Sequence, residues 1–508
     1  MNKGRTYNSI KNFIYGSFSQ ILSLVLSFGV RTVFIQYLSI VYLGLNGLFT
    51  NILTLLSLAE LGFGVAMVHA LYKPLAEDNK EKLIAYMQFY ARTYKIIGFV
   101  VAFIGCTLIP FLDKLIKGDC PADVNVTLIY ILFLSESVAS YFFAYKRSIL
   151  NADQKAYICS SVHLEAIVLR SLLQIVVIVV FKAFIVYIVI QILTTIGENL
   201  YLSYKVNKLY PYLCTKQKFQ LNKDELNSIR HNVYALILSR IAAISLKGTS
   251  NIVISAFVGL AIVGLYSNYL MIIGAVSMIL SQVFSAMTGS VGNYIAKEHP
   301  SKYLALFERL DFLNFWLYGL TAVCLFLFLN PFITIWIGKE FVLEQSTVLI
   351  IVVNFLLEGL LYTLWLFRTT VGLFTQGKYR PILAAAINIV FSIFLGKYFG
   401  INGVLLGTTI ARLCVNAWYD PYIIYKFGLH SPVQKYFKRY IFRVFLLCVI
   451  SIVSYHLKGV YDLIDSFSSF FIIAIVYFLI LNVIFSLLYR KNINFAYYKS
   501  FVFSMLKK

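Results

Sequence analysis

Hydrophobic runs of roughly 20 residues recur along the whole chain and are separated by short polar segments. An apolar helix of about 20 residues is long enough to cross the roughly 30 Å of hydrocarbon in a bilayer. The pattern therefore predicts an all-α integral membrane protein with about fourteen transmembrane helices. We expect these helices at 10–38, 44–71, 86–112, 124–148, 156–181, 183–205, 228–256, 260–290, 303–337, 345–371, 381–397, 403–426, 436–457 and 466–489.

The basic residues between the runs indicate the orientation in the membrane. If the N-terminus is cytoplasmic, most of the 44 Lys and Arg residues fall in inner segments, as the positive-inside rule requires. Both termini are therefore expected in the cytoplasm. The first run exceeds signal-peptide length and should remain as the first helix. The basic inner residues include Lys73, Lys80, Lys82, Lys205, Lys208, Lys216, Lys218, Lys223, Arg490, Lys491, Lys507 and Lys508.

Composition agrees with a membrane protein and excludes several other classes. Hydrophobic residues make up 60% of the chain and charged residues only 13%, too few for the surface of a soluble protein of this size. The net charge of +22 falls between apolar runs and not along a polar face, so nucleic acid is not expected as a partner. The seven cysteines and six histidines lack the spacing of a metal site, and no phosphate-binding loop appears. We expect neither a metal nor a cofactor.

An internal repeat gives the architecture. The segment Gly47–Leu53 reads GLFTNIL, and the later segment Gly264–Leu270 reads GLYSNYL. Further along, Glu136 and Arg147 correspond to Glu358 and Arg368 at nearly the same separation, so helices 1–6 map onto helices 7–12. An even number of helices per repeat gives both halves the same orientation in the membrane. Duplicated helix bundles of this kind are typical of secondary transporters.

The repeat divides the chain into four predicted parts. We expect a first six-helix bundle at 1–210, a cytoplasmic linker at 211–227 and a second bundle at 228–430. Residues 431–508 add two helices outside the repeat and a basic cytoplasmic tail.

Several segments together resemble a known family, the Wzx-type polysaccharide flippases of the multidrug/oligosaccharidyl-lipid/polysaccharide (MOP) exporter superfamily. They are the glycine-bearing start of the second helix at Tyr42–Phe49, the following stretch Leu58–Gly64, and the similar segments Gln154–Tyr157 and Gln376–Tyr379. The resemblance covers essentially the whole chain, although no single motif is as specific as a catalytic signature. It implies two bundles arranged in a V and a substrate of lipid-linked oligosaccharide, usually carried on undecaprenyl pyrophosphate.

The function expected from this resemblance is transport of polyprenyl-linked oligosaccharide repeat units from the inner to the outer leaflet of a bacterial plasma membrane. The product would be a surface polysaccharide such as capsule, exopolysaccharide or O-antigen. Membrane lipids, a polysaccharide polymerase and other assembly proteins are the expected partners. The chain is expected to be a transporter and not an enzyme.

Cations inside the predicted helices are the candidates for holding an anionic headgroup, because a charge in the membrane normally faces a partner or a water-filled cavity. Arg31 and Lys247 stand at almost equivalent positions before the repeated glycines, and Arg240 lies on the same helix as Lys247. Facing each other across a cavity, they could bind a pyrophosphate or an acidic sugar. Alternatively, Arg31 snorkels to the outer surface. Asn51 and Asn268, equivalent in the repeat, could bind sugar hydroxyls or tie helices together.

Two further sets of charges have open interpretations. Arg147 and Arg368 lie near the cytoplasmic interface, where they could gate an anionic headgroup or only set the topology. Glu60, Glu136 and Glu358 lie within apolar helices and could couple transport to a cation or pair with an arginine of a neighbouring helix. Arg170 in the fifth helix is expected to pair with Glu165 or Glu198.

Three rival functions remain at this point. A multidrug/cation antiporter of the same superfamily and the lipid II flippase of peptidoglycan synthesis share the architecture. A membrane-embedded glycan polymerase or ligase is the rival from another class, although its catalytic groups would need larger outer loops than the pattern predicts.

Overall fold

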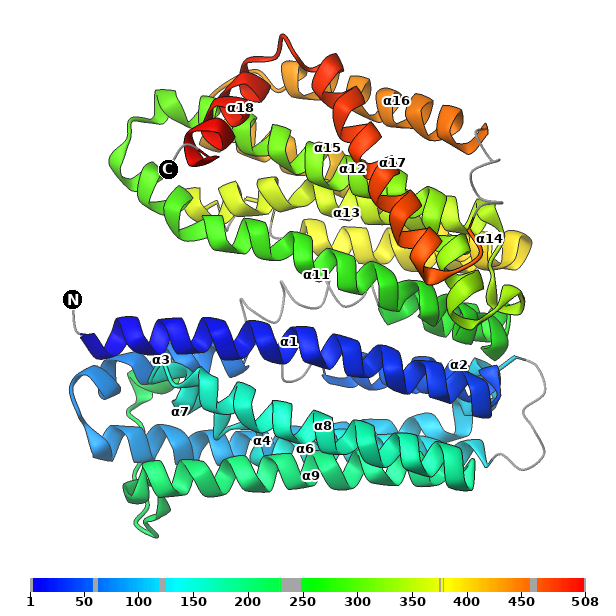
Figure 1. Ribbon diagram of the computed structural model, residues 1–508. Coiled ribbons are helices and arrows are strands. Elements are labelled where there is room, and N and C mark those ends of the chain that lie inside the picture. Colours follow the sequence, from blue (N-terminus) through cyan, green and yellow to red (C-terminus); the bar gives the residue numbers. More distant parts are fainter. Residues whose placement is uncertain are drawn as a thin grey trace. The chain divides into compact units, whose positions relative to one another are not determined.

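The computed structural model describes residues 3–57, 63–117, 125–227, 229, 248–373, 376–377, 379–456 and 464–506. Within these ranges all regular secondary structure is helical, and no strand occurs. The chain falls into two compact units, Met1–Gly264 and Leu265–Lys508, which are described separately. Both are visible in Figure 1.

In the first unit, the long helices lie side by side (Figure 1), with α1 along α8 and with α6 between α4 and α9. Its aromatic core includes Phe49, Tyr130 and Phe133, all at most 2% exposed. The rings of Phe49 and Tyr130 meet edge to face at 5.3 Å, a favourable aromatic geometry. The helices are α1 (Lys3–Tyr37), α2 (Ile40–Leu56), α3 (Phe63–Ala76), α4 (Lys80–Leu108), α5 (Leu112–Leu115), α6 (Val126–Ala144), α7 (Arg147–Ala152), α8 (Ala156–Phe181) and α9 (Phe184–Leu209), with further helical residues at 223–227 and 248–257.

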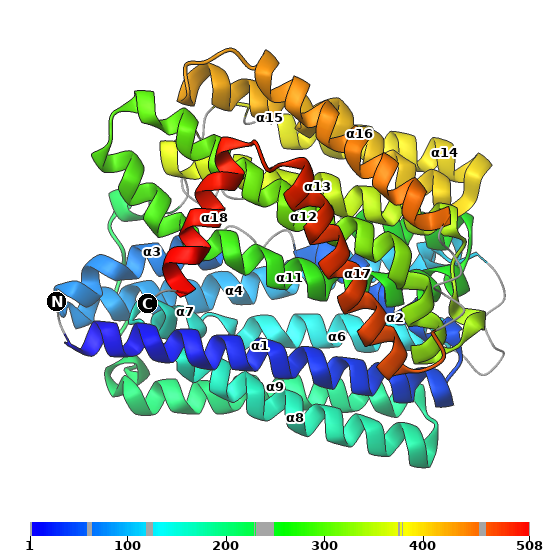
Figure 2. The same ribbon diagram turned by 45° about the horizontal axis from the view of Figure 1, so that its top comes forward.

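In the second unit, α12 is the central helix and packs against α13, α16 and α17. Figure 2 shows the two last helices, α17 and α18, on one side of α12. The helices are α11 (Leu260–Lys297, whose first residues belong to the first unit), α12 (Tyr303–Ile337), α13 (Gln345–Val371), α14 (Arg380–Ala411), α15 (Ala417–Ile423), α16 (Gln434–His456), α17 (Phe467–Leu488) and α18 (Ile493–Leu506). The π-helical turns Arg412–Asn416 and Ile424–Gly428 flank α15.

The local sequence explains where several helices begin and break. The side chains of Ser39, Asn79 and Asn125 accept hydrogen bonds from backbone N–H groups in the first turns of α2, α4 and α6, the usual role of an N-cap. Gly400 has φ 56° and ψ −136° and divides α14 into two helical runs, a conformation that favours glycine. This break confirms that two successive helices were rightly expected on either side of it.

The predicted all-α membrane architecture is confirmed. Ten helical segments of the described chain are long and apolar enough to cross a membrane, and the segment from 380 to 428 holds two of the predicted helices because of the break at Gly400. The second predicted helix is seen as α2 and α3, the thirteenth as α16, and the seventh is described only at 248–257. The bundle boundaries at 210, 227 and 430 remain predictions.

Repeated glycines bring two helix starts of the first unit into direct contact. A Cβ on Gly44 would overlap the carbonyl oxygen of Leu260, and a Cβ on Gly264 would lie 2.5 Å from the carbonyl oxygen of Ile40. Only glycine permits this closeness of backbones. The start of α2 therefore packs on residues 260–264, so the two copies of the repeat motif touch.

Candidate functional site

A polar face runs along α9 through an otherwise apolar helix. Gln191, Thr194, Thr195, Glu198 and Asn199 follow one another at helical spacing, which places them on the same side of a helix. Three of them, Thr194, Glu198 and Asn199, are buried. Buried polar groups require partners, and α6, α7 and α8 supply them.

The middle part of this face binds Glu136 of α6. Its carboxylate accepts hydrogen bonds from Gln191 Nε2 at 2.8 Å and Thr195 Oγ1 at 3.0 Å. Arg170 of α8 donates from Nε to Thr194 Oγ1 and from Nη2 to Thr195 Oγ1, both at 2.9 Å. Thr195 thus joins a carboxylate to a guanidinium, and one hydrogen-bonded network links α6, α8 and α9.

This network corrects one expectation. Arg170 was expected to pair with Glu165 or Glu198, but the hydrogen bonds of its guanidinium go to threonine hydroxyls. Glu165 instead lies 4.0 Å from the Lys205 ammonium. The helix contact was correct, but threonines at 194 and 195 stand at the level of Arg170 along α9, so they take its donors.

Glu198, one turn further along α9, binds two groups. Arg147 Nη2 lies 2.6 Å from Glu198 Oε1 and 3.2 Å from Asn199 Oδ1. His163 Nδ1 lies 3.3 Å from the same carboxylate. The Glu198 side chain is only 7% exposed, whereas that of Arg147 is 40% exposed, so the arginine borders open space.

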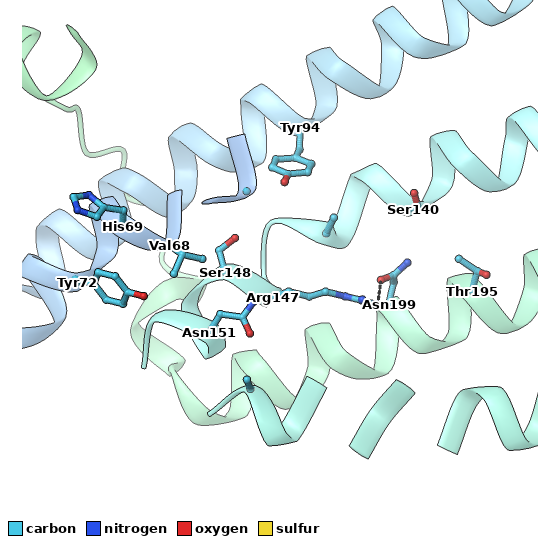
Figure 3. A pocket seen from close by; sticks show the side chains of 13 residues that line it. Val68, His69, Tyr72, Tyr94, Ser140, Arg147, Ser148, Asn151, Thr195 and Asn199 are labelled. Carbon is cyan, nitrogen blue, oxygen red and sulfur yellow. Dashed lines mark hydrogen bonds between the residues drawn. The ribbon is translucent and has the colours of Figure 1, made fainter. Parts of the chain in front are cut away.

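That open space is a cavity of about 790 Å³ at the ends of α3, α4, α6, α7, α8 and α9 (Figure 3). In Figure 3, Arg147 extends along the cavity, Tyr94 points into it from α4, and Tyr72 points toward Asn151. Its volume is in the range of small-molecule sites. The lining residues are Gly64, Val68, His69, Tyr72, Tyr94, Ser140, Ala144, Arg147, Ser148, Asn151, Ala156, Thr195 and Asn199.

The second unit holds a corresponding pair of acidic groups. Arg412 Nη2 lies 2.8 Å from Glu358 Oε2, and Arg412 also donates to the carbonyl oxygen of Asn354. The expected pairing of Glu358 with an arginine of a neighbouring helix is therefore present. Whether Glu136 or Glu358 also exchanges protons remains a prediction.

Nearer the end of the same helices, Asp420 binds both Arg368, at 3.3 Å, and Arg380. Arg368 also donates to the carbonyl oxygens of Leu373, at 2.9 Å, and Gln376, at 2.5 Å. The Arg368 side chain is 14% exposed and Asp420 is 2% exposed. This cluster is closed, whereas the one around Arg147 borders a cavity.

The two units are related by the repeat at these positions, with one inserted residue. Gln191 corresponds to Arg412 and Glu198 corresponds to Asp420, and the segment between them is longer by one residue in the second unit. The π-helical turn Arg412–Asn416 lies in that segment, and a π-turn accommodates one extra residue in a helix. It keeps Asp420 facing Arg368 as Glu198 faces Arg147.

The residues expected to line a cationic central cavity are only partly described. Arg31 is half-buried in α1 and interacts electrostatically with the Tyr187 hydroxyl of α9. Asn51 Nδ2 donates to the carbonyl oxygen of Gly47 at 2.7 Å. Asn268 is fully buried in α11, and neither polar atom of its amide has a hydrogen-bond partner among the described residues. Lys247, Arg240 and Glu60 lie outside the described residues.

Sequence reasoning missed the cavity and most of its polar wall. The missed residues include Thr195, Asn199 and His163 in the first unit and Asp420 and Arg380 in the second. A signal was available on α9, because polar residues at helical spacing inside an apolar span require internal partners. The positions of the partners on three other helices were not visible in a linear pattern.

No family model matches the chain, and no curated protein matches it. Solved structures do match. The chain superimposes on a lipid II flippase, MurJ in an inward closed conformation, with a TM-score of 0.65, 17% identity and coverage of 94% of this chain and 99% of the other. An inward-facing multidrug resistance MATE family transporter of the MOP superfamily gives 0.61, 16%, 81% and 98%, and a mutant of the Vibrio cholerae MATE transporter VcmN gives 0.55, 15%, 84% and 99%. The chain therefore has the fold of MOP-superfamily transporters.

Proposed function

We propose that this protein is a flippase that transfers polyprenyl-linked oligosaccharide repeat units from the inner to the outer leaflet of a bacterial plasma membrane. The fold supports transport, since the structures that the chain resembles are transporters and one of them is a flippase for a lipid-linked glycan precursor. The segments that resemble Wzx-type proteins favour a surface polysaccharide as the final product. Both termini would lie in the cytoplasm, and a polymerase would receive the flipped units.

One observation favours a glycan headgroup over a cationic drug. The acidic side chains inside the described spans already bind cations or hydrogen-bond donors: Glu198 binds Arg147, Glu358 binds Arg412, and Asp420 binds Arg368 and Arg380. Glu136 is held by Gln191 and Thr195. A transporter of cationic drugs needs carboxylates that face its substrate. Here the described acids are neutralised within each unit.

The proposed transport site combines two regions. Arg31, Lys247 and Arg240, with Asn51 and Asn268, would hold the anionic and polar headgroup in a central cavity while the lipid tail stays in the bilayer. Arg147 is the better candidate for a cytoplasmic gate than Arg368, because its side chain is 40% exposed and that of Arg368 is 14% exposed. Glu60, Glu136 and Glu358 are the candidates for ion coupling.

The decisive experiment measures in which leaflet the lipid-linked oligosaccharide accumulates. In the native host without this gene, an impermeant glycan-modifying enzyme should reach the oligosaccharide in inverted vesicles but not in intact cells. The wild-type protein should restore access from outside, and an Arg31→Ala, Lys247→Ala double variant should not. An unchanged distribution would refute the proposal. Growth arrest with accumulated lipid II would indicate a lipid II flippase, and resistance to cationic dyes would indicate an antiporter.

A further inference from the structure

The cavity of the first unit has a wall suited to an uncharged, hydroxyl-rich ligand. Its lining arginine, Arg147, is bound to Glu198, so the wall is nearly balanced in charge. Hydroxyl and amide groups of Ser148, Asn151 and Asn199 surround it. Such groups both donate and accept hydrogen bonds, as sugar hydroxyls do. A phosphate needs a surplus of donors and positive charge, which this described wall lacks.

Aromatic rings complete the match to a sugar. Tyr72 of α3 is 51% exposed, and the ring of His69 lies 6.1 Å from its ring at 72°. The Tyr94 ring points into the cavity from α4 (Figure 3). An exposed ring offers an apolar face to the C–H groups of a pyranose while its hydroxyl remains available for hydrogen bonds.

The repeat provides an internal comparison that makes simple framework packing a poor explanation for the cavity. In the second unit, the space around Arg412 and Asn416 has only about 10 Å³, roughly the smallest volume that holds a water molecule. Arg380 fills the region near Asp420, and its equivalent in the first unit, by the same alignment of the repeats, is the smaller Cys159. One copy of the repeat is filled by its own side chains and the other is open.

The cavity is also connected to the buried network. Thr195 lines the cavity and at the same time binds Glu136 and Arg170. Arg147 lines it and binds Glu198. A ligand that hydrogen-bonds to this wall would therefore contact the groups that hold α6, α7, α8 and α9 together.

We propose that this cavity is a glycan subsite, in which one sugar of the lipid-linked oligosaccharide stacks on Tyr72 and hydrogen-bonds to Asn151 and Asn199 at the inner end of the first unit. The inference rests on the proposed function, because it names the part of the substrate that binds there. It separates recognition of the sugar from recognition of the phosphate, which the central cations would hold. The ligand class is a neutral or amide-bearing pyranose.

The test uses a reporter that lines the cavity without contributing a polar contact. Val68→Cys is introduced into a variant whose other cysteines, except the exposed Cys214, are replaced. Labelling by N-ethylmaleimide is followed in inverted vesicles from three hosts. The first host makes no lipid-linked sugar, the second makes only the lipid with its phosphate and first sugar, and the third makes the complete repeat unit. Cys214 is the internal control.

We expect the complete repeat unit to slow labelling at position 68 at least about fivefold while labelling at Cys214 is unchanged. Tyr72→Ala should weaken this protection about tenfold, a loss equivalent to about 1.4 kcal/mol and typical of one aromatic contact. The matched control Tyr422→Ala, in a cavity of about 380 Å³ of the second unit, should leave it unchanged. Equal labelling with and without the repeat unit would overturn the subsite, and equal protection by both lipids would show an anion site instead.

The leaflet experiment separates failure of this inference from failure of the proposed function. If Val68→Cys does not fold, Tyr72→Ala and Asn151→Ala are tested in the native background for accumulation of oligosaccharide in the inner leaflet. Accumulation in both, but not in Tyr422→Ala, supports the subsite. Normal flipping by both variants refutes the subsite while the flippase function stands. An unchanged leaflet distribution on deletion of the gene refutes the function itself.

Discussion

Replacing Arg412 with methionine tests whether the ion pair with Glu358 stabilises the second unit. The arginine is 8% exposed, and its Nη2 lies 2.8 Å from a carboxylate whose side chain is 24% exposed. Removing one partner of a buried pair costs about 3–5 kcal/mol, because the other charge stays behind in a poorly solvated place. The partial exposure of Glu358 places the expected loss near the lower end, about 3 kcal/mol.

Tryptophan fluorescence measures this loss selectively. All four tryptophans, Trp316, Trp336, Trp365 and Trp418, lie in the second unit, so their emission during heating reports unfolding of that unit. For a domain of this size, about 3 kcal/mol corresponds to a decrease in Tm of roughly 6–12 °C. The purified variants are compared in lipid nanodiscs of one composition.

A double-mutant cycle with Glu358→Gln decides between the two roles of the carboxylate. A stabilising pair requires that the double variant loses less stability than the sum of the two single variants, with a coupling of about 1–3 kcal/mol. Additive losses, or a decrease in Tm below about 2 °C for Arg412→Met, would refute the structural argument. If Glu358→Gln keeps its Tm but abolishes flipping driven by an ion gradient, the carboxylate serves ion coupling.

Three further variants test other parts of the argument. Gly44→Val should fail to fold or lose most of its flipping, since any Cβ there overlaps Leu260 and that clash is with backbone; normal protein levels and flipping would contradict it. Thr195→Val keeps the shape but removes the hydroxyl that binds Glu136, so it should destabilise the first unit by about 1–3 kcal/mol, measured by hydrogen exchange, with Thr195→Ser as the rescuing control. Hydrogen bonds from serines hold the pKa of Asp465 below its usual value; its contribution to the start of α17 should therefore be complete above about pH 4 and be lost as the pH falls through the lower folded value, and an Asp465→Asn variant should lack this pH dependence in hydrogen exchange.

The fold could be predicted from sequence because a membrane permits few alternatives. Backbone groups in hydrocarbon must be satisfied within a helix, so the apolar runs gave the helix positions directly. The break in α14 at Gly400 was placed correctly because a polar, glycine-containing segment separates two apolar runs. Glu358 was also correctly expected to meet an arginine from a neighbouring helix, since a buried carboxylate requires a cation or donors.

The cavity could not be predicted, because its wall comes from six helices whose rotation about their axes the sequence does not define. Arg170 shows the difficulty. It was assigned to an acidic partner on charge alone, yet its height along α8 brings it to two threonines of α9. Charge predicts that a partner exists, whereas the side-chain level and the helix rotation decide which residue it is.

The comparison of the two repeats links these observations to function. A π-turn at Arg412–Asn416 absorbs one extra residue and preserves the contact between Asp420 and Arg368, which indicates that an arginine–acid pair at this level is required by the bundle itself. Arg147 and Glu198 meet the same requirement in the first unit. What differs is the neighbouring position, where Arg380 closes one copy and Cys159 leaves the other open. Since the pair satisfies the framework in both units, the cavity beside Arg147 needs a different explanation, and a bound sugar supplies one.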